Sequence, residues 1–362
     1  MVRILEIVFT NPKYGGGLEK VSITLGNYLN EKGINVSYIF SDIKNYEMFE
    51  DKFKFIAIKN NHKYIGKLIF NIKVYNYVKR HKDEYDIYHI NGDNGGLITK
   101  IHNIKTILTL HGSSKLAMHS IGTLNIFKLL YLYVSNRLEL FAAKRADVVT
   151  LVSPFLKEFI INETKRKDLV VIENGIDIKK YIPVEKSFAK ERLGLNREQL
   201  YGIWVGRDPG RKRLDFSIEL IENTKELNLI CIGNTNTKRN VSNRIKLLGN
   251  VDDNKLIEYY QACDFLLFPS LYEGFSLVII EAMACGTVPI INNNITIPGL
   301  ENNVNAFIAN NDEDYIKILK NIEKNPSIVE NMRNNAISLS HKYSSSISYE
   351  KYYNLIMDLY AT

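Results

Sequence analysis

Short β-rich runs alternate with helical patterns along the chain, and this alternation restricts the possible folds more than any other feature of the sequence. A strand followed by a helix and another strand folds into a parallel sheet that is covered by helices. The first half therefore predicts a doubly wound α/β domain. Its expected strands are 2–9, 35–41, 53–58, 87–90, 106–110, 148–152 and 169–172, and its expected helices are 18–31, 67–81, 124–143 and 154–161.

The second half repeats the alternation and ends in helices. At 362 residues the chain is longer than one hydrophobic core normally grows, so two domains are expected. We place them at 1–178 and 179–345, with a hinge in the polar stretch 174–196 around Pro183, and expect the last helix (346–362) to pack back on the first domain. The expected strands here are 202–205, 227–232, 246–248, 264–268 and 288–291, and the expected helices are 214–224, 254–261, 276–284, 312–323, 327–338 and 346–359.

Composition places the chain among soluble globular proteins, because 45% of its residues are apolar and 24% are charged. Cys231, Cys263 and Cys285 follow no metal-binding or disulfide spacing, so we expect buried thiols in a reducing compartment. The apolar run at the N-terminus contains Glu6 and predicts a strand rather than a signal peptide. The sequence has no run of about 18 uninterrupted apolar residues that could span a membrane. We therefore expect a cytoplasmic protein.

Positive charge is concentrated in one part of the chain. The net charge is +7, and residues 51–150 alone hold 16 Lys and Arg against 7 Asp and Glu. Such a basic surface favours a polyanionic neighbour, although a solvated lysine-rich face is the alternative. Because the pattern at 126–140 is amphipathic, we expect residues 51–150 to dock on an anionic membrane surface rather than on nucleic acid. The protein would then be peripheral on the inner face of the membrane.

One strand–loop–helix unit carries the strongest indication of a binding site. The apolar strand before Pro269 leads into a loop with Glu273 and Gly274, and a helix that carries Glu281 begins near Ser276. Such a loop lies at the carboxyl end of its strand, where open α/β sheets bind ligands. The N–H groups at the start of the helix favour an anion such as a phosphate. The unit therefore predicts a site for a phosphate-bearing, hydroxyl-rich molecule.

Three other segments place suitable residues directly after strands. Gly16 and Gly17 open a helix, where glycine either lets backbone amides approach a ligand or serves a turn with positive φ. Arg207 and Lys212 belong to a run of cations that suits a diphosphate, unless the run is only a solvated face. His111 ends another strand and either presents its ring to a ligand or has a structural role.

The stretch 269–286 is very similar to the Glu-x7-Glu motif of retaining glycosyltransferases of family 4. The segment 109–112 resembles the family's T-x-H-G sequence, and 174–177 resembles its Asn-Gly-Val-Asp sequence at the domain junction. The resemblance covers about residues 2–345. It implies the GT-B architecture, in which two doubly wound Rossmann-like domains face each other across a cleft. The N-terminal domain lies on the acceptor side and the C-terminal domain binds the nucleotide sugar.

The resemblance also implies roles for individual residues. Glu281 would hold the ribose hydroxyls, Glu273 the hydroxyls of the donor sugar, and His111 would lie beside the reacting sugar. The family binds the donor diphosphate with the first glycine loop, an Arg and a Lys five residues apart, and amides at the start of the motif helix. The matching residues here are Gly16, Gly17, Arg207, Lys212, Ser276 and Leu277, with Gly274 and Phe275 in the connecting turn.

Two departures from the family pattern stand next to these residues. Arg213 follows Lys212 where relatives usually carry Gly, so the local backbone could differ. Asn91 stands where many relatives carry a second His, which could change contacts on the acceptor side. Two further departures, the lack of a Gly-x-Gly sequence at 233–235 and of a Gly at 305–307, do not touch the carboxylate or cation motifs.

These residues predict a retaining, hexosyltransferase-type glycosyltransferase that moves a sugar from a nucleoside-diphosphate sugar to a glycan or lipid-linked acceptor. No metal or other cofactor is expected, because cations and helix amides can hold the diphosphate. The sequence contains no HExxH motif, Ser–His–Asp order or Cys/His cluster. Two alternatives remain: a GT-B nucleotide-sugar 2-epimerase, which needs no acceptor, and a non-catalytic basic partner protein.

Overall fold

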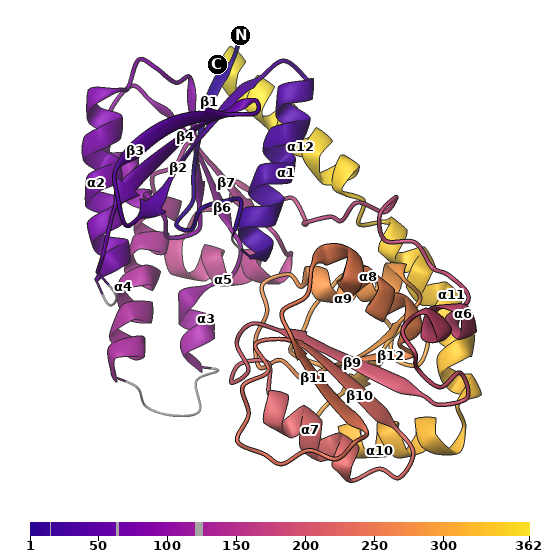
Figure 1. The fold of residues 1–362 in the computed structure, drawn as a ribbon. Helices are drawn as coiled ribbons and strands as arrows, with labels where there is room; N and C mark the ends of the chain where they lie inside the picture. Colours follow the sequence, from indigo (N-terminus) through magenta and orange to yellow (C-terminus); the bar gives the residue numbers. More distant parts are fainter. Residues whose placement is uncertain (15, 63–64, 120–125) are drawn as a thin grey trace. The chain divides into compact units, whose positions relative to one another are not determined.

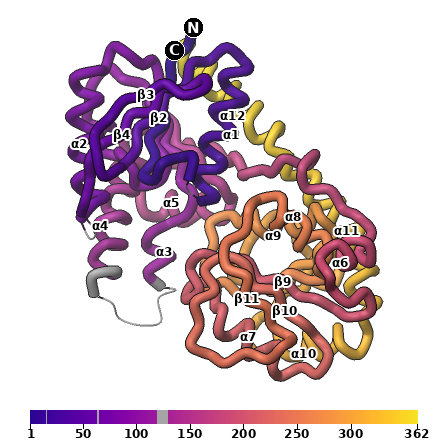
Figure 2. Tube along the Cα trace, viewed as in Figure 1, coloured from indigo at the N-terminus to yellow at the C-terminus, as the bar shows by residue number. Residues whose placement is uncertain are grey.

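The computed structural model describes residues 1–14, 16–62, 65–119 and 126–362, which form two compact units (Figures 1 and 2). The first unit holds Met1–Asn174 and Ile347–Thr362, and the second holds Gly175–Ser346. Gly15 of the glycine loop and the first two residues of the expected helix 124–143 lie outside the described residues.

The first unit is built on an eight-stranded sheet in the order β3-β4-β2-β1-β5-β6-β7-β8. All neighbouring strands are parallel except the edge pair β3–β4. The winding reverses between β1 and β5. The strands are β1 (Arg3–Ile7), β2 (Asn35–Asp42), β3 (Tyr46–Glu50), β4 (Phe53–Lys59), β5 (Ile87–Asn91), β6 (Lys105–Leu110), β7 (Val148–Leu151) and β8 (Leu169–Val171).

Helices cover both faces of this sheet, so both sets of alternating strand side chains are buried. On one face, Ile4 of β1 belongs to the same core cluster as Leu25 of α1 and Ile356 of α12. On the other face, Ile7 and Val74 of α2 both lie next to Gly95. The helices of this unit are α1 (Gly17–Glu31), α2 (Gly66–Arg80), η1 (Gly96–Lys100), α3 (Ser114–His119), α4 (Ile126–Ala143), α5 (Phe155–Thr164) and α12 (Ser345–Ala361).

The last helix, α12, packs on the first unit next to α1 (Figure 1). The ring of Tyr349 lies 5.7 Å from that of Tyr28 on α1, and its hydroxyl hydrogen-bonds Thr24. One turn further on, the hydroxyl of Tyr352 lies 3.2 Å from the Thr109 hydroxyl in β6. The C-terminus of the chain thus completes the core that its N-terminal strands begin.

The second unit is built on a parallel six-stranded sheet in the order β11-β10-β9-β12-β13-β14, and its winding reverses between β9 and β12. Its strands are β9 (Tyr201–Gly206), β10 (Asn228–Gly233), β11 (Ile245–Gly249), β12 (Phe265–Phe268), β13 (Val288–Asn292) and β14 (Phe307–Ala309). Its helices are α6 (Lys186–Arg192), α7 (Leu214–Glu222), α8 (Asp253–Ala262), α9 (Leu277–Ala284), α10 (Asp312–Lys324) and α11 (Ser327–His341).

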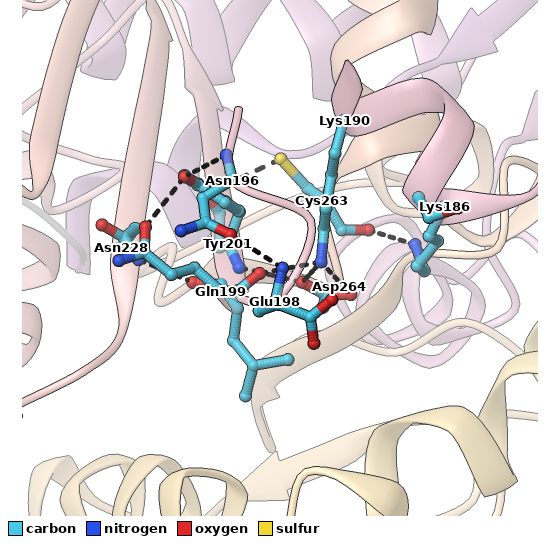
Figure 3. A network of polar contacts seen from close by, with 12 residues as sticks. Lys186, Lys190, Asn196, Glu198, Gln199, Tyr201, Asn228, Cys263 and Asp264 are labelled. Carbon is cyan, nitrogen blue, oxygen red and sulfur yellow. Dashed lines mark hydrogen bonds and ion pairs between the residues drawn. The ribbon is translucent and has the colours of Figure 1, made fainter. Parts of the chain in front are cut away.

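Part of the expected hinge is a helix, α6, that is fixed to the second unit by buried polar contacts (Figure 3). Lys190 Nζ lies 3.1 Å from Asp264 and donates to the carbonyl of Gln199 at 2.8 Å. Asp264 also accepts the backbone N–H of Tyr201 at 2.9 Å. Lys186 donates to the carbonyl of Cys263. The hinge expected over 174–196 is therefore too long, because its second half belongs to the second unit.

The three cysteines of the second unit are buried free thiols, which confirms that they pack as small apolar side chains.

Removal of the Ile356 side chain should destabilise the first unit, because this residue of α12 is fully buried against the sheet. We expect I356A to lower the free energy of unfolding by about 2–5 kcal/mol, through lost burial and the cavity left behind. Ile347 lies on the same helix but is 47% exposed, so I347A should change it by less than about 0.5 kcal/mol. Urea unfolding followed by circular dichroism measures both, and equal effects of the two substitutions would contradict the packing of α12.

Candidate active site

The predicted motifs of the second unit lie at the point where its sheet reverses its winding. The loop after β9 holds residues 207–213 and the loop after β12 holds residues 269–276, and these two strands are neighbours in the sheet. Parallel strands place both loops at the same edge, where doubly wound sheets bind ligands. Gly233, at the end of β10, allows the backbones of β10 and β9 to lie close together at this edge. A side chain at Gly233, where φ is +109°, would come within 2.1 Å of the Gly206 carbonyl oxygen.

Glu273 is the centre of a partly buried cluster of polar contacts between the two loops. Its Oε1 atom accepts hydrogen bonds from Arg211 Nη1 at 2.7 Å and from Ser270 Oγ at 2.8 Å. Lys212 Nζ lies 3.3 Å from the same oxygen. The carbonyl of Arg211 accepts the N–H of Leu271 at 3.0 Å. Arg211 therefore joins the two loops through both its side chain and its backbone.

Burial and opposite charges together set the protonation of this cluster. Burial alone would raise the pKa of Glu273, but the attraction of Lys212 and Arg211 outweighs it, and the pKa lies below its ordinary value. Burial lowers the pKa of Lys212, and the Glu273 carboxylate opposes that shift. The Lys212 ammonium also lies 4.1 Å from the centre of the Phe268 ring. Two cations share one carboxylate here, which leaves positive charge for an anionic ligand.

Arg207 and Lys212, which the sequence predicts as a pair, lie in different surroundings. Arg207 is exposed, whereas Lys212 is buried and its carbonyl accepts the Trp204 indole N–H at 2.9 Å. At Glu273 it is Arg211 that joins Lys212. The sequence analysis missed Arg211 as a site residue, and only its place in the same cation run could have indicated it.

Arg213 adopts the left-handed backbone conformation, with a φ of 51°, that glycine takes most easily. Its guanidinium forms two hydrogen bonds with Asp312, at 2.7 and 2.6 Å, and lies 3.8 Å from the centre of the Phe216 ring. The loop therefore has a backbone that a glycine would also allow, and the Arg213 side chain binds the start of α10 rather than Glu273.

Glu281 is buried on α9, and two tyrosine hydroxyls hold its carboxylate. Tyr181 donates to Oε1 at 2.9 Å and Tyr260 donates to Oε2 at 3.3 Å. Burial raises the pKa of both tyrosines, and the charge of Glu281 raises it further, so both remain protonated donors. The sequence analysis missed these tyrosines, since nothing in their spacing indicates a contact with Glu281.

The start of α9 lies at the same edge as Glu273. Ser276 is the buried N-cap residue, and its side chain makes no capping bond to any described residue. Leu277 is the first helical residue, and the first N–H groups of a helix have no acceptor within it. Gly274 leads into this turn, and Phe275 is anchored by the ring of Tyr343 at 5.4 Å. The Ser276 and Leu277 amides therefore lie at the start of α9, and their binding of an anion stays a prediction.

In the first unit, the glycine loop follows β1, one of the two strands where the winding reverses. Gly16 is the N-cap of α1, with a φ of −96°, and Gly17 is the exposed first residue of the helix. The Gly16 N–H donates to Glu19 at 2.7 Å. Neither glycine has a positive φ, so a left-handed turn does not explain these two positions. The close approach of a ligand to the backbone here stays a prediction.

His111 follows β6 and belongs to a buried hydrogen-bond network. Its Nε2 atom lies 3.0 Å from Oδ1 of Asn91, the last residue of the neighbouring strand β5, and the Asn91 amide donates to Glu6 at 2.9 Å. Burial, with repulsion from His89, lowers the pKa of His111 to about 3. The ring is therefore a neutral donor and acceptor at physiological pH.

A second buried carboxylate holds the segment after His111. Glu139 of α4 accepts hydrogen bonds from the Ser114 N–H at 3.0 Å and the Ser114 hydroxyl at 2.9 Å. Burial, followed by repulsion from Asp93, raises the pKa of Glu139 to about 7. Lys67 opposes this shift, and it pairs with both oxygens of Asp93 at 2.6 and 2.8 Å.

The expected site residues therefore fall into two groups, one in each unit. The first unit holds Gly16, Gly17 and His111, and the second holds Arg207, Lys212, Glu273, Gly274, Phe275, Ser276, Leu277 and Glu281.

In the part of the chain that the structure describes, no group of three or more His, Cys, Asp or Glu side chains could hold a metal ion.

Two family models match the chain. Glycosyltransferase Family 4 matches residues 15–180, and glycosyl transferases group 1 matches residues 185–339. The first match covers most of the first unit and extends a few residues past Asn174, the second lies within the second unit, and together they include the Glu273 cluster, Glu281 and His111.

Curated proteins and solved structures agree with these matches. The chain is 29% identical over 277 residues to the UDP-Gal:alpha-D-GlcNAc-diphosphoundecaprenol alpha-1,3-galactosyltransferase of Escherichia coli, covering 70% of this chain and 67% of that protein. It is 24% identical over 313 residues to the alpha-monoglucosyldiacylglycerol synthase of Acholeplasma laidlawii, covering 78% and 77%. The fold matches sucrose-phosphate synthase from Thermosynechococcus elongatus with a TM-score of 0.84 at 18% identity over the whole of both chains. The expected fold class of two doubly wound, Rossmann-like domains is confirmed.

Glu139 should make stability depend on pH. Its pKa is about 7 in the folded protein against 4.5 for an ordinary Glu, so the protonated form is favoured by folding. Its contribution is therefore complete below about pH 4.5 and is lost as the pH rises through about 7. We expect the stability of wild type relative to E139Q to fall by on the order of 1–3 kcal/mol between pH 5 and pH 8.

Urea unfolding at four pH values measures this difference. Glu158 is exposed on α5, so E158Q should follow the wild-type profile. A constant difference between wild type and E139Q at all four pH values would show that Glu139 does not titrate in this range.

Proposed function

The chain belongs to the family 4 glycosyltransferases and uses a nucleotide-sugar donor, and we propose that it transfers the sugar with retention of configuration, without a metal ion, to a lipid-linked or glycan acceptor. One observation supports this most strongly. Lys212, Arg211 and Glu273 meet beside the start of α9, at the reversal point of the second sheet. Cations, helix amides and a fixed carboxylate together suit a diphosphate that carries a sugar.

The donor diphosphate binds at the positive charge of this cluster. Lys212 and the Ser276 and Leu277 amides bind its oxygens, and exposed Arg207 approaches from the solvent side. Glu273, whose pKa is lowered by its cations, accepts hydrogen bonds from hydroxyls of the donor sugar. Glu281, held by Tyr181 and Tyr260, accepts hydrogen bonds from the ribose hydroxyls.

Catalysis then consists mainly of stabilising the leaving group. As the bond between the sugar carbon and the phosphate oxygen breaks, negative charge grows on the diphosphate, where Lys212 and the helix amides are already oriented. The acceptor hydroxyl bonds to the same carbon on the face from which the diphosphate leaves, and its proton passes to a phosphate oxygen. This route requires no protein base, and neutral His111 contributes a hydrogen bond to a sugar ligand.

Features of the first unit support the proposal that the acceptor is bound to a membrane. Exposed apolar side chains lie on α2 (Leu68 and Ile72) and on α4 (Leu130 and Tyr133), and the two helices meet where Lys67 Nζ lies 5.3 Å from the Tyr131 ring. The surrounding segment, 51–150, is strongly basic. No helix in the described ranges is long and apolar enough to cross a membrane. We propose that this surface docks on anionic lipid, in keeping with two relatives whose names contain diphosphoundecaprenol and diacylglycerol.

Donor binding and turnover test the proposed reaction. UDP-, GDP- and ADP-sugars are screened by thermal shift, and turnover is followed with and without EDTA. We expect one nucleotide class to stabilise wild type but not Glu281→Ala. We expect Lys212→Ala to lose about 10²–10³ in turnover with the fold intact, because one charge-stabilising donor is removed. Arg239 pairs with Glu219 on the exposed face of the same unit, so Arg239→Ala is the matched control.

The outcomes separate the alternatives. NMR of the product reads its anomeric configuration, and an inverted configuration or loss of turnover in EDTA would contradict the mechanism. Conversion of the donor at C2 without an acceptor would indicate a 2-epimerase. No shift with any nucleotide sugar would indicate a non-catalytic partner.

Flotation with vesicles tests the membrane surface. Lys79 and Arg80 are exposed at the end of α2, and each basic residue near an anionic surface contributes about 1 kcal/mol. The double substitution Lys79→Glu and Arg80→Glu should weaken binding to phosphatidylserine vesicles at least about tenfold. Lys238→Glu with Lys246→Glu, an equal charge change at exposed positions of the second unit, should not. Wild-type binding that is equal for neutral and anionic vesicles would overturn this part of the proposal.

A further inference from the structure

Glu6 in β1 is a fully buried carboxylate that is linked to His111 through Asn91. It has no role in the proposed reaction. Three donors surround it. His89 Nδ1 lies 2.7 Å from Oε1, while Asn91 Nδ2 and Ser22 Oγ donate to Oε2 at 2.9 and 3.2 Å. Such a set of donors stabilises the ionised form of a buried carboxyl group.

An ionised carboxylate accepts hydrogen bonds and cannot donate. Asn91 must therefore turn its NH₂ group toward Glu6, which directs its amide oxygen toward Nε2 of His111, 3.0 Å away. That oxygen in turn only accepts. The His111 ring must consequently carry its proton on Nε2, and Nδ1 is left as an acceptor.

His89 contacts the other oxygen of Glu6, Oε1, and is itself held by further residues. His89 Nε2 lies 2.7 Å from the Thr109 hydroxyl, which also contacts the hydroxyls of Thr150 at 2.6 Å and Tyr352 at 3.2 Å. Tyr352 belongs to the C-terminal helix α12. The His89 ring is thus fixed between Glu6 and Thr109 and cannot turn its Nδ1 atom away from the carboxylate.

We propose that Glu6 is a positioning residue that, through Asn91, fixes His111 in the Nε2-protonated form, so that Nδ1 accepts a hydrogen bond from a sugar hydroxyl. The role of His111 toward a sugar rests on the proposed function, whereas the position of its proton does not. Because the pKa of His111 is lowered to about 3 by burial and by His89, the ring is neutral at pH 7 and has one nitrogen without a proton. His111 then orients a hydroxyl and does not act as an acid.

The position of the proton is measured in the ligand-free protein. Two-bond ¹H–¹⁵N NMR of histidine-labelled wild type at pH 7 distinguishes the two tautomers, and loss of signals in His111→Ala assigns the ring. We expect a protonated Nε2 and a bare Nδ1. A proton on Nδ1 in wild type would overturn the proposal without bearing on the glycosyltransferase reaction.

Glu6→Gln tests the origin of this preference. A glutamine can present either its oxygen or its NH₂ group, so the Asn91 amide is no longer held in one orientation, and we expect signals of both His111 tautomers. Ser22→Ala removes another hydrogen bond to the same oxygen of Glu6 without touching the path to His111, and should keep the wild-type signals. Identical His111 signals in Glu6→Gln and wild type would overturn the role of Glu6.

A second variant covers a failure of Glu6→Gln to fold. Asn91→Ala keeps the His89 and Ser22 contacts of Glu6 but removes the acceptor of the His111 proton, so it should also give both tautomers. With the nucleotide sugar that the thermal-shift screen selects, both variants should lower kcat/KM by about ten- to a hundredfold, the loss that is common when the hydrogen-bond partner of a metal-binding histidine is removed. Wild-type kcat/KM in variants whose tautomers are mixed would show that the position of the proton does not serve the reaction.

Discussion

The carboxyl edge of the parallel strands in each sheet is the constraint on which both groups of site residues depend. Every loop that follows a parallel strand emerges at this edge, so residues far apart in the sequence meet there without a connection of their own. Lys212 follows β9 and Glu273 follows β12, while Gly16 follows β1 and Asn91 ends β5. In each sheet these two strands are neighbours, and the winding of the sheet reverses between them. Helix starts at the same edge add N–H groups that favour anions.

A carboxylate whose burial is costly lies within the second group of residues and beside the first. The loss of hydration of a buried ion opposes folding by several kcal/mol, and only well-placed partners offset it. Glu273 is compensated by two cations and the Ser270 hydroxyl, and Glu6 by three hydrogen-bond donors. Such clusters add little net stability, but they fix each side chain in one orientation. Fixed orientation is what a charge-stabilising site needs, because its dipoles must already point at the atoms on which charge develops.

Local sequence patterns were sufficient to predict the central strands, because a parallel strand buried on both faces is a continuous apolar run. They missed β3, an edge strand with charged residues, and β14, which has three residues. At the candidate site, two motifs singled out Glu273 and Lys212, whose charged atoms the structure places 3.3 Å apart. They could not show that Arg211 rather than Arg207 reaches Glu273, since that depends on how the two loops pair at Leu271. The tyrosines on Glu281 are contacts between distant segments, which no local pattern contains.

The departures from the family pattern at Arg213 and Asn91 differ in their physical consequence. A left-handed backbone costs a residue with a side chain roughly 1–2 kcal/mol, and Arg213 offsets this cost through its paired hydrogen bonds to Asp312 and its stacking on Phe216. The backbone, and hence the position of Lys212, is compatible with the glycine pattern. Asn91 changes the chemistry instead. The NH₂ group of its amide donates to the Glu6 carboxylate, so the amide oxygen is directed toward His111. The charge of Glu6 thereby sets the direction of the hydrogen bond between Asn91 and His111. The first departure therefore preserves the backbone of the proposed donor site, whereas the second determines the orientation in which the His111 ring would meet a sugar.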